Sequence, residues 1–133
     1  GMVETMKKAL IEADSVVYNS ASTGIYLDKL FTNLGILDQL KPKTTRYPDG
    51  ASVMEHVIRG KGKEIGFGAI TEIRLYTAKG LKFVGPLPAE VQNYTRYDAA
   101  LMSSAKPSED AAAVLKLLAT PAARTVFSTA GIE

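Results

Sequence analysis

Short strand-like runs alternate along this chain with segments whose apolar residues recur at helical spacing. The strand-like runs cover residues 15–19, 44–47, 64–68 and 81–85, and helical spacing covers residues 3–13, 27–34 and 52–58. Parallel strands need long crossover connections, which are usually helices, so this alternation is typical of a parallel sheet. The sequence therefore predicts an α/β fold in which a mainly parallel sheet is flanked by helices.

The C-terminal part of the chain has a different pattern. Residues 94–103 alternate in polarity and are predicted to form a strand. Two helices are predicted after it, each opened by a proline, Pro107 and Pro121. Gly131 ends the second helix, since glycine tolerates the left-handed backbone of a helix stop.

Composition excludes several kinds of site. The 133 residues include no cysteine and one histidine, so thiol nucleophiles, thiolate metal sites and multi-histidine metal sites are excluded, and no cofactor is expected. A formal net charge of +2 with scattered lysines does not favour nucleic-acid binding. No apolar run approaches the roughly 20 residues of a membrane span. Gly1 before Met2 is typical of a residue left by tag cleavage, so an export signal upstream stays an open question.

The most informative stretch is YNSASTGIYLDKL, residues 18–30, in which a strand gives way to a helix. A helix N-terminus carries unpaired N–H groups and a partial positive charge, and both favour a bound anion. Small residues let a solute approach the backbone, and hydroxyls add neutral donors. The next strand–helix junction repeats this pattern, so both junctions are candidate anion contacts. The candidate residues are Ser20, Ala21, Ser22, Thr23 and Gly24 at the first junction and Gly50, Ala51 and Ser52 at the second.

Two other interpretations compete with anion binding. Ser22 or Thr23, and likewise Ser52, could only cap their helices, as serine and threonine commonly do. Ser22, His56 and Asp49 could form a hydrolytic triad, but the chain has no Gly-x-Ser-x-Gly elbow and nothing in the sequence makes the three converge. His56 is expected to face solvent, because it points away from the apolar stripe of its predicted helix.

Four segments in this order resemble the extracellular solute-binding proteins of ABC importers, specifically the molybdate-binding-like group. They are ASTGIYLDKLFTNLGI, EIGFGAITEI, LKFVGPLPAEVQNYT and ATPAARTVFSTAGIE. The resemblance implies a binding protein with two α/β lobes that close over a small solute. It also implies that residues 1–93 form a second-lobe-like α/β domain and residues 94–133 a crossing strand with C-terminal helices, while the N-terminal half of the first lobe is absent.

The resemblance also implies particular contacts. The family's second-lobe contact at a helix N-terminus falls at Ala21, with Ser22 and Thr23 beside it, and its second contact falls at residues 50–52. The tyrosine that molybdate binders place after a glycine-rich strand matches Ala69 in GFGAITE. That departure from the family's pattern argues against molybdate itself.

These observations predict a solute-binding component of an ABC importer that binds a small oxyanion or polar solute and is not an enzyme. The alternatives are a ligand-sensing effector domain of a regulator, or a truncated remnant without ligand. The implied partners are the solute and an ABC permease, and the implied location is periplasmic or extracellular if an export signal lies upstream. A homodimer is expected, because the apolar faces of the C-terminal helices need cover.

Overall fold

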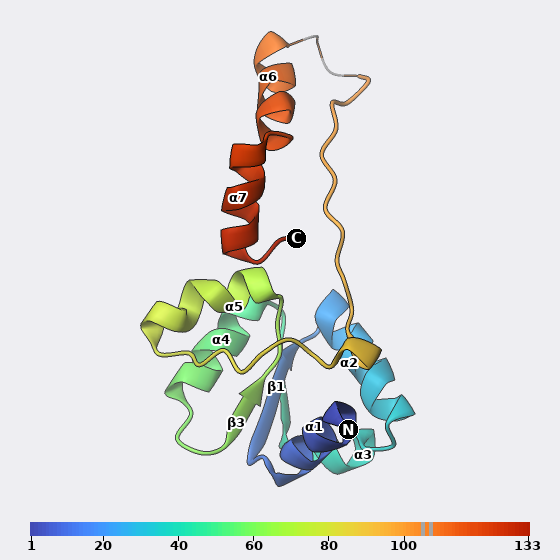
Figure 1. Cartoon of the computed structure of the whole chain (residues 1–133). Coiled ribbons are helices and arrows are strands. Elements are labelled where there is room, and N and C mark those ends of the chain that lie inside the picture. The colour runs from blue at the N-terminus through green and yellow to red at the C-terminus, as the bar shows by residue number, and fades with distance from the viewer. Residues whose placement is uncertain (105, 107) are drawn as a thin grey trace. The chain divides into compact units, whose positions relative to one another are not determined.

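The computed structural model describes residues 1–104, 106 and 108–133. The chain divides into two compact units, Gly1–Asn93 and Tyr94–Glu133 (Figure 1). Pro107, which was predicted to open a helix, lies outside the described residues.

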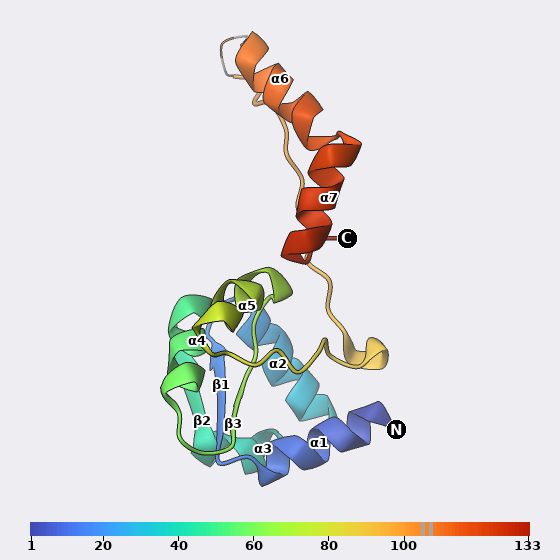
Figure 2. The same ribbon diagram turned by 60° about the vertical axis from the view of Figure 1, so that its left-hand side comes forward.

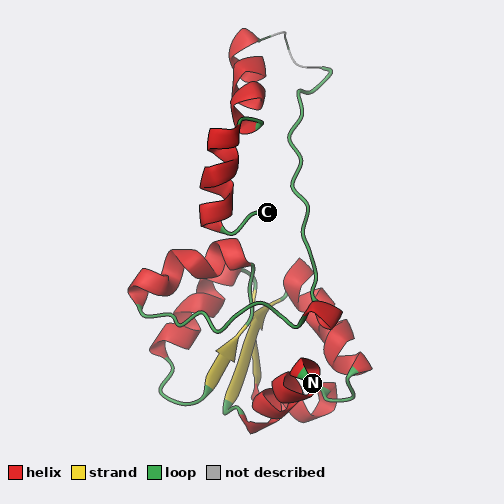
Figure 3. Ribbon diagram, in the orientation of Figure 1, coloured by secondary structure: helices red, strands yellow, loops and turns green. Residues whose placement is uncertain are grey.

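The first unit is built on a three-stranded parallel sheet of order β2-β1-β3 (Figure 3). The strands are β1 (Ser15–Asn19), β2 (Thr44–Tyr47) and β3 (Glu64–Gly66). The central strand sets the register, with Val16 opposite Thr44 on one side and Ile65 on the other. Helical crossovers join the strands in sequence, so the predicted α/β fold with a parallel sheet is confirmed.

Helices cover both faces of this sheet (Figure 2). Val16 and Tyr18 point into one apolar cluster, and Val17 between them points into the other, as the alternation of a strand requires. The first cluster is closed by α1 (Met2–Glu12), α2 (Ser22–Asn33) and α3 (Leu37–Leu40), and the second by α4 (Gly50–Arg59) and α5 (Ile70–Tyr76). Short 3₁₀ turns span Lys41–Lys43, Thr77–Lys79 and Ala89–Val91.

Three predictions about regular structure need correction. The third strand ends at Gly66 rather than at residue 68, and residues 81–85 form no strand in the described structure. A strand needs a hydrogen-bonded neighbour, and Leu81 instead packs its side chain into the second cluster while Gly85 takes a positive φ. Helix α5 was not predicted, although Ile70, Ile73 and Tyr76 recur at its spacing of three.

The second unit contains two helices, α6 (Glu109–Leu118) and α7 (Pro121–Ala130). Ser108 Oγ accepts from the N–H of Ala111, and Thr120 Oγ accepts from the N–H of Ala123, so both helices carry side-chain caps. No residue of either helix is buried among the described residues. The strand predicted for residues 94–103 is wrong, because the described part of the chain offers this segment no strand to pair with.

Candidate functional site

The three parallel strands end at one edge of the sheet, here termed the carboxyl edge, and the chain after each strand enters a helix. The carboxyl edge consists of residues 20–24 after β1, 48–52 after β2 and 67–69 after β3. The backbone N–H of Ser20 donates to the carbonyl of Tyr47 at 2.8 Å, which holds the first two of these junctions together. All sequence-predicted site residues lie at this edge, where ligands bind in open α/β sheets.

Helix α2 is capped by the asparagine that ends β1, and not by a serine or threonine. Asn19 Oδ1 accepts from the N–H of Ala21 at 3.1 Å and from the N–H of Gly24 at 3.0 Å. Capping by Ser22 or Thr23 is therefore wrong: the helix begins at Ser22, so both lie inside the first turn, while Ala21 takes the N-cap position.

The positive end of α2 is left uncompensated. Among the described residues, the backbone N–H groups of Ser22 and Thr23 have no acceptor. The first turn carries no acidic residue, and Ser22 is exposed. An exposed helix end with free donors and no carboxylate is the arrangement that favours an anion.

Helix α4 begins differently, because carboxylates already lie at its N-terminus. Asp49 Oδ1 accepts from the N–H of Ser52 at 2.8 Å, and Asp49 Oδ2 accepts from the Ser52 hydroxyl at 3.1 Å. Capping by Ser52 is thus wrong, since Asp49 is the cap. The carboxylate of Glu72 from α5 lies so close to Gly50 that a β-carbon there would collide with it.

Ala69 is the N-cap of α5, in extended conformation with φ −68° and ψ 141°. The chain before it is held to the sheet, because the N–H of Phe67 donates to the carbonyl of Val17 at 3.0 Å. The Ala69 side chain is exposed at the carboxyl edge.

A charged cluster that the sequence did not predict lies behind the first turn of α2. The guanidinium of Arg46, on β2, binds Asp28 of α2 through Nη1 at 3.1 Å to both carboxylate oxygens. Arg46 Nε donates to the Asn19 carbonyl at 3.0 Å, and the guanidinium lies 4.4 Å from the centre of the Tyr18 ring. Only the cross-strand pairing of Tyr18 with Arg46 creates this cluster, so no local pattern could have revealed it.

The same cluster perturbs Tyr18. Burial first, and then the hydrogen bond its hydroxyl donates to Asp28 at 2.9 Å, raise the pKa of Tyr18 to about 12. Both causes favour the neutral phenol, since burial penalises the phenolate and the neighbouring carboxylate repels it. Tyr18 is therefore a structural donor here.

His56 does not face solvent as predicted. Its Nδ1 lies 2.9 Å from the Tyr47 hydroxyl, and its Nε2 lies 3.3 Å from Oε2 of Glu64, whose side chain is 15% exposed. Because His56 is bound to these residues and Asp49 to Ser52, the Ser22–His56–Asp49 triad does not form.

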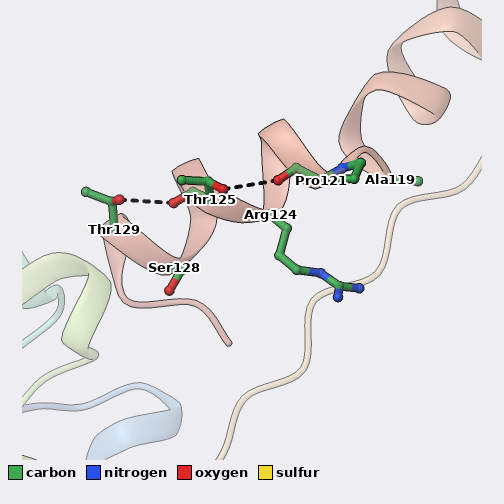
Figure 4. Close-up of a pocket in the computed structure, with 6 residues that line it drawn as sticks. All are labelled: Ala119, Pro121, Arg124, Thr125, Ser128 and Thr129. Carbon is green, nitrogen blue, oxygen red and sulfur yellow. Dashed lines mark hydrogen bonds between the residues drawn. The ribbon is translucent and has the colours of Figure 1, made fainter.

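One pocket lies along α7 in the second unit (Figure 4). Thr125 Oγ donates to the carbonyl of Pro121 at 3.2 Å, and Thr129 Oγ donates to the carbonyl of Thr125 at 3.0 Å. Two of its hydroxyls are thus engaged with the helix backbone, and the pocket contains no sequence-predicted site residue. Its lining residues are Ala119, Pro121, Arg124, Thr125, Ser128 and Thr129.

Neither a metal-binding cluster nor a membrane-spanning helix occurs among the described residues. No group of three or more His, Cys, Asp or Glu side chains is placed to hold a metal ion among them. Within the same residues, every helix is too short or too polar to cross a bilayer.

Comparison with known proteins identifies the family. Residues 5–133 match the bacterial extracellular solute-binding proteins. The chain belongs to this family. A curated relative, an aconitate isomerase from Pseudomonas sp, is 28% identical over 131 residues, which are 98% of this chain and 49% of the relative. The chain thus spans about half the length of that relative, and no solved structure matches it.

Proposed function

We propose that this solute-binding family member binds a small solute bearing a carboxylate or other oxyanion group at its carboxyl edge. The N-terminus of α2 carries the proposal, because the N–H groups of Ser22 and Thr23 lack acceptors among the described residues. The hydroxyls of Ser20, Ser22 and Thr23 would add donors around the same anionic group.

The second junction suits a different part of the same solute. Asp49 and Glu72 place negative charge at the start of α4. Gly50, Ala51 and Ser52 would therefore face a hydroxyl or another donor group of the solute, and not its anionic group. Ala69, which is exposed at the same edge, would lie beside the solute. A hydroxy acid or a related polar carboxylate would place its carboxylate at the N-terminus of α2 and its hydroxyl at the start of α4.

The relative named an aconitate isomerase supports a carboxylate more than molybdate, because aconitate is a tricarboxylate. It also raises a second candidate, catalysis on such a compound. We favour binding without turnover, since the family is one of solute-binding proteins. Incubation with cis-aconitate, followed by chromatography, should show no trans-aconitate above the buffer control. Formation of trans-aconitate would overturn the non-enzymatic assignment.

The proposed role is delivery of the solute to an ABC permease outside the cytoplasm, as expected for an extracellular family. Co-purification with a co-expressed ABC permease, enhanced by the solute, would support this role. An upstream export signal in the natural reading frame is the matching expectation for the location.

We further propose that the chain forms a homodimer through its second unit. Several apolar side chains of this unit are exposed, among them Val114 at 54%, Leu117 at 62% and Val126 at 66%. Burial stabilises such side chains by about 1.5 to 3 kcal/mol each, which favours association. Light scattering should report about twice 14.3 kDa, and removal of residues 107–133 should abolish pairing. A monomer at high concentration would overturn the dimer.

Direct titration tests the binding proposal. Calorimetry and thermal unfolding should show stabilisation by trans-aconitate or citrate, with affinity closer to millimolar than to nanomolar, because a single helix end contributes only about 0.3 to 1 kcal/mol. Molybdate serves as the oxyanion comparison, and an uncharged polyol as the negative control. An equal response to the polyol, or none to any anion, would overturn the proposal.

A further inference from the structure

We infer that Arg46 is a positioning residue for the solute site, acting through Asn19; the inference rests on the proposed function. Arg46 joins three elements: its own strand β2, the strand β1 and the helix α2. The Asp28 carboxylate neutralises the charge of this guanidinium, since Nη1 contacts both of its oxygens. The role that we infer for Arg46 is therefore geometric and does not depend on its charge.

The geometric chain runs from Arg46 to the donors of the solute site. Arg46 Nε fixes the main-chain carbonyl of Asn19 at 3.0 Å. The side chain of Asn19 then takes the N–H groups of Ala21 and Gly24, at 3.1 and 3.0 Å. With those two N–H groups occupied, the N–H groups of Ser22 and Thr23 remain without an acceptor among the described residues.

Gly24 shows how tightly this assembly is packed. A β-carbon at Gly24 would collide with the Asn19 carbonyl and would lie 2.6 Å from Nη2 of Arg46. The first turn of α2 therefore lies directly on the carbonyl and on the guanidinium. The planar guanidinium of Arg46 lies over the Tyr18 ring and donates to both Asn19 and Asp28. The ammonium group of a lysine cannot reproduce this pair of contacts, here termed the guanidinium fork.

The first test uses Arg46→Lys, which keeps the net charge and removes the fork. We expect trans-aconitate to bind the full chain about fivefold more weakly, the largest effect that one helix end can have on affinity. Without any solute, amide exchange at Ala21 and Gly24 should also accelerate, while amides of β1 and β3 stay protected. The matched control is Tyr18→Phe, which keeps the stacked ring and the Arg46–Asn19 bond and should bind within about twofold of wild type.

The second test separates positioning from electrostatics by the sign of its effect. Asp28→Asn removes a negative charge, so electrostatics alone predicts tighter binding of trans-aconitate, whereas release of the guanidinium fork predicts weaker binding. This variant decides the matter if Arg46→Lys does not fold. Weaker binding supports the positioning role; equal or tighter binding overturns it, as does unchanged exchange at Ala21 and Gly24 in a folded Arg46→Lys protein. A wild-type chain that responds to no anion overturns the proposed function itself, and this role with it.

Discussion

Helices α2 and α4 begin at the same edge of the same sheet, yet their N-termini have opposite electrostatic character. An asparagine caps α2 with a neutral amide, whereas an aspartate caps α4, and the Glu72 carboxylate lies beside it. The backbone of each helix supplies the same partial positive charge. The difference therefore comes from the capping side chain, which decides whether that charge is left for a solute or cancelled within the chain.

Replacing the glycine of each first turn should produce the largest difference. Gly24→Ala should lower the free energy of unfolding by about 3 kcal/mol, because the new methyl group meets the fixed Asn19 carbonyl. Gly50→Ala should cost below about 1 kcal/mol, since the Glu72 carboxylate that it meets can move away. Urea unfolding followed by circular dichroism measures both values. Equal costs would mean that the two first turns are packed equally tightly.

Truncating the two caps should have an intermediate effect. Asn19→Ala should lower the free energy of unfolding by about 2 kcal/mol, because two N–H groups lose their acceptor, and Asp49→Ala by about 1 kcal/mol, because one backbone donor does. The same urea unfolding measures both. A larger cost for Asp49→Ala would reverse the order derived from the two sets of hydrogen bonds.

Exchanging the chemistry of the caps tests the comparison most directly. Asn19→Asp keeps both acceptor positions and should raise stability by about 0.5 kcal/mol, while it abolishes stabilisation by trans-aconitate. Asp49→Asn should lower the free energy of unfolding by about 0.5 kcal/mol, and trans-aconitate should stabilise this variant more than it stabilises the wild type. Thermal unfolding with and without trans-aconitate measures all of these changes. An Asn19→Asp protein with the full wild-type response would place the solute elsewhere.

The smallest expected effect is the pH dependence that Tyr18 and its hydrogen bond to Asp28 give to stability. The pKa of Tyr18 rises in the folded protein to about 12, above the ordinary tyrosine value of 10.0. The folded state therefore keeps the proton that the unfolded state loses, so this stability is fully present below pH 10 and is lost as pH rises to 12. Absorbance of the phenolate should show one of the six tyrosines titrating late, and Tyr18→Phe should remove that step. A titration curve that Tyr18→Phe leaves unchanged above pH 10 would contradict the burial of Tyr18 and its hydrogen bond to Asp28.

Sequence reasoning succeeded where short-range periodicity carries the information. The strands at 15–19 and 44–47 and the helices that follow them were predicted because apolar spacing and turn residues are local signals. It failed for residues 81–85 and 94–103, since a strand forms only where a neighbour supplies hydrogen bonds. The sequence also predicted an anion contact at both junctions without distinguishing them.

The amino-acid sequence by itself determined that this protein is an α/β chain with a small, hydroxyl-rich junction after its first strand and a junction of small residues after its second. Only the tertiary structure decided which groups meet at those junctions. Glu72 reaches Gly50 from α5, and Arg46 reaches Asn19 from the neighbouring strand. Both contacts join residues far apart in the chain, and their geometry depends on strand register and helix packing, which no local pattern of residue types encodes.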